Sequence, residues 1–149
     1  MSEQQSFEKR VIELQSELKA PKNQYNSFGK YKYRNQEDIL EALKPLLKKY
    51  DLGLTITDEV KEVGGLVFIE ARAILHAEGN SVEAKAQAGI DPNRKGMDIS
   101  QTFGSSSSYA RKYALNGLLL IDDTKDADSK DNSTNNAAPR AAKSTSNPF

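Results

Sequence analysis

The stretch that decides the fold runs from Leu52 to Ile90 and reads LGLTITDEVKEVGGLVFIEARAILHAEGNSVEAKAQAGI. Apolar residues occupy every second position along most of it, which is the period of a half-buried β-strand. Two turn signals, Gly64-Gly65 and Gly79-Asn80, divide it into three segments of strand length. The sequence therefore predicts a three-stranded antiparallel meander with one apolar face and one mixed, solvated face.

Two helices are predicted before this meander. The first has Ser2 as its N-cap and ends before Pro21. Its apolar residues are Phe7, Val11, Leu14 and Leu18. The second begins at Asn35, an N-cap with Asp38 in the third helical position. Its apolar face consists of Ile39, Leu43, Leu46, Leu47 and Tyr50. Because Pro45 removes one hydrogen bond of this second helix, we expect a kink there.

One long helix is predicted after the meander, beyond a loop that reads DPNRKGMD. It starts at Asp98, which forms a capping box with Gln101. The residues expected on one face are Phe103, Ala110, Tyr113, Ala114, Gly117 and Ile121. The small residues from Gly104 to Ser108 have poor helix propensity, so they indicate that the backbone closely approaches either the sheet or a ligand.

These elements predict an α+β fold: a three-stranded antiparallel sheet packed by a long C-terminal helix, with two preceding helices. The 149 residues are enough for one domain with a hydrophobic core, which we place at residues 1–123. Residues 124–149 are rich in Ser, Thr, Asn, Ala and charge. Such a composition buries too little apolar surface to offset the entropy of ordering, so we predict a disordered tail.

The motifs of common enzyme classes are missing from the sequence. There is no cysteine, which excludes disulfides and thiolate sites, and no GxxxxGK[ST] motif for nucleotide phosphates. The single histidine, His76, falls on the solvated face of a predicted strand. The acidic run DDTKDAD lacks the turn glycine and the final glutamate of an EF-hand. We therefore predict no enzymatic activity, no catalytic residues, no metal site and no cofactor.

No signal directs the chain to a membrane. No apolar run approaches the roughly 20 residues that a membrane-spanning helix needs. The start, MSEQQSFEKR, has no hydrophobic segment of the kind found in signal peptides. We expect a cytoplasmic protein without a membrane partner.

Basic and aromatic residues are interleaved in two segments. The chain has 21 basic and 21 acidic residues, but the segment from Lys22 to Arg34 contains four cations and no acid. Within it, NQYNSFGKYKYR alternates tyrosines with lysines, and a second cluster follows at Tyr109, Arg111, Lys112 and Tyr113. Cations neutralise phosphates and aromatic rings stack on bases, so the two clusters together favour nucleic-acid binding.

Two longer motifs resemble the ERF (essential recombination function) family of phage single-strand DNA annealing proteins. The first is YKYRNQEDILEALKPLLKKYDLGL, and the second is SQTFGSSSSYARKYALNGLLLIDDTKDAD. The resemblance covers about residues 30–128, with the strands in between matching in pattern. It implies an ATP-independent protein that anneals complementary single strands in phage homologous recombination. It also implies a homo-oligomer, in the form of a ring or filament, in the host bacterial cytoplasm.

The resemblance also implies a set of DNA-binding residues. By matching position these are Tyr31, Tyr33, Arg34, Gln101, Gly104, Ser105, Tyr109, Arg111 and Tyr113. Lys112 stands where the family has a second arginine, so bidentate contact with a phosphate is lost there. The predicted set is completed by the further cations Lys30, Lys32, Arg94, Lys95 and Lys112.

Two other functions stay open at the level of the residues. Without its first helix, the predicted order is α-β-β-β-α, which is that of a double-stranded RNA-binding domain. Alternatively, the apolar stripe of the first helix joins subunits of an assembly protein that has no nucleic-acid role.

The tail has two open interpretations of its own. It ends in Pro148-Phe149, which resembles the tip of bacterial single-stranded DNA-binding proteins. The acids expected near such a tip are replaced here by Arg140 and Lys143, which favours a plain solubilising tail. The alternative is that Phe149 docks on a host recombination or single-strand-binding factor, or in a groove of the domain itself.

Overall fold

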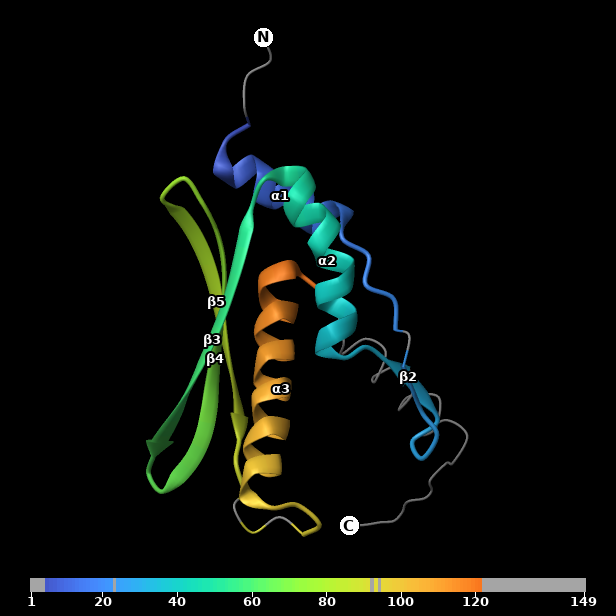
Figure 1. The fold of residues 1–149 in the computed structure, drawn as a ribbon, viewed down its shortest axis with the longest axis vertical. Helices are drawn as coiled ribbons and strands as arrows, with labels where there is room; N and C mark the ends of the chain where they lie inside the picture. Colours follow the sequence, from blue (N-terminus) through green and yellow to red (C-terminus); the bar gives the residue numbers. More distant parts are fainter. Residues whose placement is uncertain (1–4, 23, 92, 94, 122–149) are drawn as a thin grey trace, which may run out of the picture. The chain divides into compact units, whose positions relative to one another are not determined.

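The computed structural model describes residues 5–22, 24–91, 93 and 95–121 (Figure 1). The elements are α1 (Phe7–Glu17), β1 (Gln24–Asn26), β2 (Tyr31–Tyr33), α2 (Gln36–Tyr50), β3 (Gly53–Val63), β4 (Leu66–Ala77), β5 (Asn80–Gly89) and α3 (Ile99–Leu119). They divide into two units: one contains residues up to 21 and residues 34–121, and the other contains the β1–β2 hairpin. Arg94 and the predicted tail at 124–149 lie outside the described residues.

The predicted meander is confirmed. Strands β3, β4 and β5 form an antiparallel sheet in that order, and both connections are two-residue turns. Gly64 and Gly65 form the first turn with φ of 58° and 84°, the positive values that a tight hairpin needs. The second turn lies one residue earlier than predicted, at Glu78-Gly79, because Asn80 already pairs with Ala77. Both residues of this turn have left-handed backbone conformations: φ is 50° at Glu78 and 82° at Gly79.

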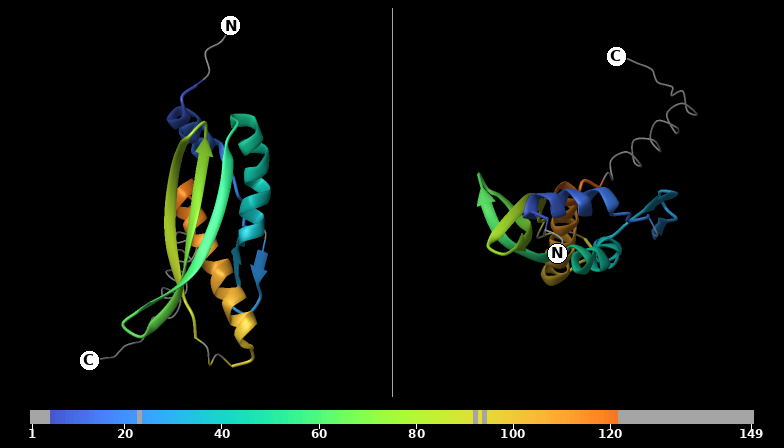
Figure 2. Two further views of the ribbon diagram at one scale, coloured as in Figure 1. Left: turned by 60° about the vertical axis from the view of Figure 1, so that its left-hand side comes forward. Right: turned by 90° about the horizontal axis from the view of Figure 1, so that it is seen from above.

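Small side chains bring α3 close to the sheet. Helix α3 lies along one face of the sheet (Figures 1 and 2). Most of the strand residues that pack against it are alanines. They are Ala71, Ala73, Ala84, Ala86 and Ala88, and they meet Ala110 and Ala114 of α3. A Cβ placed on Gly117 would lie 3.8 Å from the Cβ of Ala84. This close approach confirms that the long C-terminal helix packs the sheet, and the fold class is α+β as predicted.

The other side of α3 is covered by α1 and α2. Leu14 of α1, Ile39 and Leu43 of α2, and Leu115 of α3 are fully buried. The side-chain amide of Gln15 donates a hydrogen bond of 2.8 Å to the carbonyl of Leu118. Helix α3 thus lies between the sheet and α2 (Figure 1). Its buried residues include both alanines and leucines.

The helix starts test the predicted caps. Asn35 with Asp38, and Asp98 with Gln101, form the predicted capping boxes. The first helix starts later than predicted, because Ser6 rather than Ser2 accepts from the N–H of the third helical residue, Lys9; Ser2 lies outside the described residues. Helix α2 continues through Pro45 to Tyr50. No helix of the described residues has both the length and the apolarity needed to cross a membrane.

A buried arginine ties α1 to the rest of its unit. The guanidinium of Arg10 donates to the carbonyls of Tyr50, at 3.1 Å, and Asp51, at 2.9 Å, where α2 ends. Its other terminal nitrogen pairs with Glu78 in the β4–β5 turn. The terminal carbonyls of a helix lack partners within the helix and carry partial negative charge, so a cation there is favourable. Arg10 thus joins three segments that are far apart in the sequence.

We expect Arg10→Met to lower the free energy of unfolding by roughly 1–3 kcal/mol, because two carbonyls at a buried position lose their donor. Methionine keeps part of the apolar stem, so the loss reports mainly the hydrogen bonds. The control is Glu78→Gln, whose expected cost is below about 1 kcal/mol, since the Glu78 side chain is half exposed and glutamine keeps an oxygen that can accept from Arg10. Urea denaturation followed by circular dichroism measures both. Equal losses in the two variants would contradict the role given to the carbonyls.

Candidate nucleic-acid interface

The β1–β2 hairpin carries the first candidate cluster. Its strands pair through Gln24 with Tyr33 and Asn26 with Tyr31. The rings of Tyr31 and Tyr33 meet edge to face, with centroids 6.1 Å apart, so the two tyrosines share one side as expected for alternate strand positions. Phe28 at the turn is 98% exposed. The hairpin therefore presents aromatic rings to solvent rather than burying them.

The hairpin turn contains Gly29, and the contacts around it leave no room for a side chain. The side-chain oxygen of Asn26 accepts from the N–H of Gly29 at 2.9 Å, and its amide donates to the hydroxyl of Tyr31 at 3.0 Å. A Cβ on Gly29 would lie 2.3 Å from a ring carbon of Tyr31, so a side chain there would displace the ring. Lys30 follows with φ 58°, and both Lys30 and Lys32 are exposed.

Arg34 differs from the expected solvated cation. It lies just after β2, is 8% exposed, and its Nε donates to the carbonyl of Ala20 at 2.7 Å. Its charge is therefore engaged inside the unit that contains α1 and α2. A fully extended segment would place Lys30, Lys32 and Arg34 on one side. Only Lys32 lies in β2, because the strand begins at Tyr31 and ends at Tyr33.

The second cluster separates onto two flanks of α3. Residues 109 and 113 are one helical turn apart, whereas 109 and 111 differ by roughly 200° around the helix axis. Tyr109 and Tyr113 lie beside β5, and Arg111 lies beside β3, at the opposite edge of the sheet. We call these the tyrosine flank and the arginine flank. The residues are neighbours in the sequence, but they do not form one surface patch.

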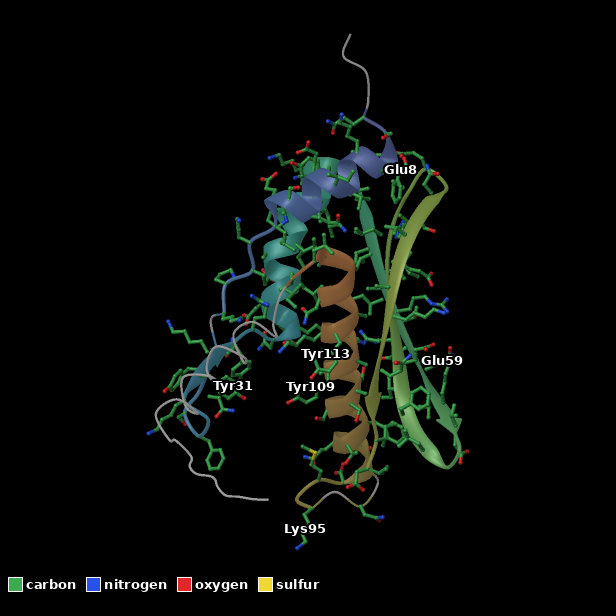
Figure 3. The ribbon with its side chains drawn as sticks, turned by 180° about the vertical axis from the view of Figure 1, so that it is seen from behind. Glu8, Tyr31, Glu59, Lys95, Tyr109 and Tyr113 are labelled. Atoms are coloured by element: carbon green, nitrogen blue, oxygen red, sulfur yellow. The ribbon has the colours of Figure 1, made fainter. Side chains whose placement is uncertain are left out.

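The tyrosine flank forms a shallow, open pocket of about 390 Å³. Its lining residues are Gln87, Ala88 and Gly89 of β5 and Ser105, Ser106, Tyr109 and Tyr113 of α3. The two rings are 6.1 Å apart and tilted by 31°, and they are 49% and 46% exposed (Figure 3). Tyr113 was predicted on the packing face, but it lies at the rim of that face with half its surface in solvent.

The serine run has separate roles at successive positions. Ser106 is buried and its hydroxyl donates to the carbonyl of Gly89 at 2.8 Å, so it packs α3 on the sheet. Ser107 instead faces β3, and Ser105 lines the pocket. Gly104 is exposed, and a Cβ there would meet no atom within 4 Å. The run thus faces both the sheet and the solvent.

The arginine flank is held by a carboxylate that the sequence analysis did not identify. Asp58 of β3 accepts hydrogen bonds from the Ser107 hydroxyl at 2.5 Å and from Arg111 Nε at 2.9 Å. The pKa of Asp58 is held below its usual range. The largest cause is the hydrogen bond from Ser107, and the hydrogen bond and charge of Arg111 add to it, whereas partial burial acts in the opposite direction. A signal existed: Leu54, Ile56, Asp58 and Val60 alternate along one face of β3. A carboxylate in such a row predicts a partner on the element above.

The other candidate residues lie around the start of α3 and along it. Gln101 closes the capping box, its side-chain oxygen accepting from the N–H of Asp98 at 3.0 Å. Lys95 is exposed in the loop before α3 (Figure 3), and Lys112 is partly buried on the helix. His76 hydrogen-bonds Thr55 across two strands at 3.0 Å. Among the described residues no three acids or histidines are grouped so that they could hold a metal ion.

Comparisons with known proteins agree with the motifs. Residues 7–148 match the model of the ERF superfamily. The chain is 51% identical over 142 residues to the Essential recombination function protein of Salmonella phage P22; the match covers 95% of this chain and 68% of that protein. No solved structure matches the chain significantly.

Gly104 is expected to destabilise α3, and the packing of the unit does not require a glycine at this position. A glycine within an exposed helix costs about 1 kcal/mol relative to alanine, and nothing lies where its Cβ would be. We therefore expect Gly104→Ala to raise the free energy of unfolding by roughly 0.5–1 kcal/mol in thermal or urea melts. Ser108→Ala, at an exposed position one turn later, is the matched control. A destabilised Gly104→Ala variant would show that the unit itself needs the glycine.

Proposed function

Because the chain belongs to the ERF superfamily, we propose that it binds single-stranded DNA and anneals complementary strands in phage homologous recombination, without nucleotide hydrolysis. The observation that carries this proposal is the tyrosine flank of α3, where two half-exposed rings border an open pocket. The name of the phage P22 relative supports the link to recombination.

The tyrosine flank suits an unpaired base. Aromatic side chains bind single strands by stacking, because every base has a π-face and stacking needs no particular sequence. Tyr109 and Tyr113 leave about half their surface in solvent, so their rings can be covered by a base without unfolding the helix. Gln87 and Ser105 add polar groups at the rim. In a duplex the base faces are already stacked, so the flank favours single strands.

The charges that would bind phosphates are present, although the formal net charge is zero. Arg111 and Lys112 lie on α3, and Lys95 lies in the loop before it. Each phosphate that a cation neutralises releases condensed counterions, which makes binding weaker as salt rises. The hairpin offers a second surface of the same kind, with Lys30 and Lys32 beside exposed rings.

Annealing by such a protein needs no nucleotide hydrolysis. If contacts to sugar and phosphate hold one strand extended, its pairing edges stay free for a complementary strand. Stacking and pairing of the new duplex then supply the free energy, about 1.4 kcal/mol per base-pair step for DNA. The protein's part is to keep each strand free of its own secondary structure and to raise the local concentration of partners.

We also propose that the functional form is a homo-oligomer, a ring or a filament. One unit of this size covers few nucleotides, so a long strand is held only by an array of sites. Among the described residues no further strand pairs with the outer edges of β3 and β5, and unpaired edges are ready to associate. Exposed apolar side chains gather where β3 turns into β4: Val60, Val63 and Leu66 are 54%, 67% and 61% exposed. Open edges and apolar patches together favour contact between copies.

Fluorescence anisotropy with labelled oligonucleotides tests the binding proposal. We expect preference for single-stranded DNA over duplex DNA and duplex RNA, with affinity falling as salt rises from 50 to about 200 mM. A preference for duplex RNA would instead indicate a double-stranded RNA-binding module. No salt-dependent binding to any of the three would leave an assembly protein without a nucleic-acid role.

Two variants of one residue extend that test to the tyrosine flank. Tyr109→Ala should weaken single-strand binding by about 1–3 kcal/mol, the usual contribution of one stacked base. Tyr109→Phe keeps the ring and is expected to bind nearly as the wild type does. Equal loss in both variants would show that the hydroxyl matters rather than the ring.

Multi-angle light scattering tests the oligomer. We expect a mass that is many times the 16.5 kDa of the chain, either free or on a long oligonucleotide. A strict monomer under both conditions would refute this proposal. That result would not bear on single-strand binding, which the anisotropy measurements test separately.

A further inference from the structure

A carboxylate on the arginine flank is paired with one of the cations that we propose to bind phosphates of DNA. Asp58 lies on the α3-facing side of β3, paired with Ala71, in a row that is otherwise apolar. Its side chain is 23% exposed, and it is bound from α3 by both Ser107 and Arg111. A negative charge there repels phosphate, so a DNA-binding surface gains nothing from it unless the carboxylate does something else.

The geometry of Arg111 shows what the carboxylate does. Of its five N–H donors, the one on Nε is bonded to Asp58, at 2.9 Å. Neither terminal nitrogen has a hydrogen-bond partner among the described residues, and the side chain is 33% exposed. The planar guanidinium binds phosphate best through two parallel N–H groups. Arg111 is thus held on one side, and its terminal edge stays open.

We propose that Asp58, with Ser107, is a positioning residue that fixes Arg111 so that its terminal nitrogens meet a phosphate of single-stranded DNA. This inference rests on the proposed function. A free arginine loses much side-chain entropy when it is fixed on a ligand, an effect on the order of tenfold in affinity. Asp58 imposes that restriction in advance, through hydrogen bonds between β3 and α3. The repulsion of one partly solvated carboxylate is reduced by salt and by its pairing with Arg111.

Removing the carboxylate distinguishes positioning from charge, because the two effects have opposite signs. Asp58→Ala and Asp58→Asn both remove one negative charge, but the asparagine oxygen can still accept from Arg111 Nε. If Asp58 positions Arg111, Asp58→Ala weakens binding by on the order of tenfold and lowers the salt slope by about 0.7, the share of one phosphate on single strands. Asp58→Asn then lies between Asp58→Ala and the wild type.

If charge alone matters, both variants bind more tightly than the wild type and equally to each other, and that result would overturn the inference. Glu62→Gln is the control for charge: Glu62 is an exposed acid on the same strand, four residues further on. Its removal is expected to leave binding unchanged or slightly tighter. Weakening by Glu62→Gln as large as that by Asp58→Ala would also contradict positioning.

A double-mutant cycle tests whether Asp58 acts through Arg111. Asp58→Ala should have no weakening effect in an Arg111→Ala background, because the group that it positions is gone. A loss of the same size in both backgrounds would assign the effect to Asp58 itself or to the fold. Thermal melts of every variant accompany the titrations. If Asp58→Ala fails to fold, Ser107→Ala is measured in its place. This variant removes one of the two hydrogen bonds to Asp58 and leaves the charge unchanged. Unchanged DNA binding by Ser107→Ala would overturn the proposal.

The outcomes separate this inference from the proposed function. Wild-type protein that does not bind single strands would refute the proposed function. Normal wild-type binding with no effect of Arg111→Ala would refute the phosphate contact, and the inference with it. Weakened binding by Arg111→Ala together with tighter binding by Asp58→Ala would refute the positioning role alone.

Discussion

The close approach of α3 to the sheet is the constraint on which the rest of the structure depends. Alanines on both surfaces and the hydrogen bond from Ser106 to Gly89 set the separation between helix and sheet. At that separation the short side chain of Asp58 can reach Ser107 and Arg111 from β3. On the other flank, Ala88 and Gly89 of β5 line the tyrosine pocket. A larger side chain in the alanine layer would lift the helix and alter both flanks together, because packed interiors transmit strain.

Most of the fold could be predicted from the sequence, because its signals are local. The period of two in Leu52–Ile90 identified the three strands, and the capping boxes at Asn35 and Asp98 located two helix starts. The errors have local causes as well. Ser6, rather than Ser2, caps α1, since both serines precede the same apolar stripe. The β1–β2 pairing was not predicted, because strands of three residues are too short to show alternation.

The exposure of most candidate residues could be predicted from their residue type, but their arrangement could not. The tyrosines and lysines that were expected in solvent are largely there, but the cluster at 109–113 divides between two flanks, as the turn of a helix requires. Arg34 is buried against Ala20, and this follows from how α1 ends and not from any motif. Asp58 could have been found, since a carboxylate in an apolar row needs a partner. The contacts of Arg10 could not have been, because their partners come 40, 41 and 68 residues later.

The distance in sequence between Arg10 and its partners affects the order in which the unit can assemble during synthesis. Helix α1 is synthesised before α2 and the sheet, but the carbonyls that accept from Arg10 belong to Tyr50 and Asp51, and its ion-pair partner is Glu78. The two carbonyl contacts cannot form until the chain has been synthesised past Asp51, and the ion pair cannot form until the β4–β5 turn has been added. The apolar stripe of α1 likewise has no α3 to cover until residue 119 has been added. Helix α1 is therefore synthesised before the segments that it contacts and docks late, on a unit whose sheet forms from contacts close in the sequence.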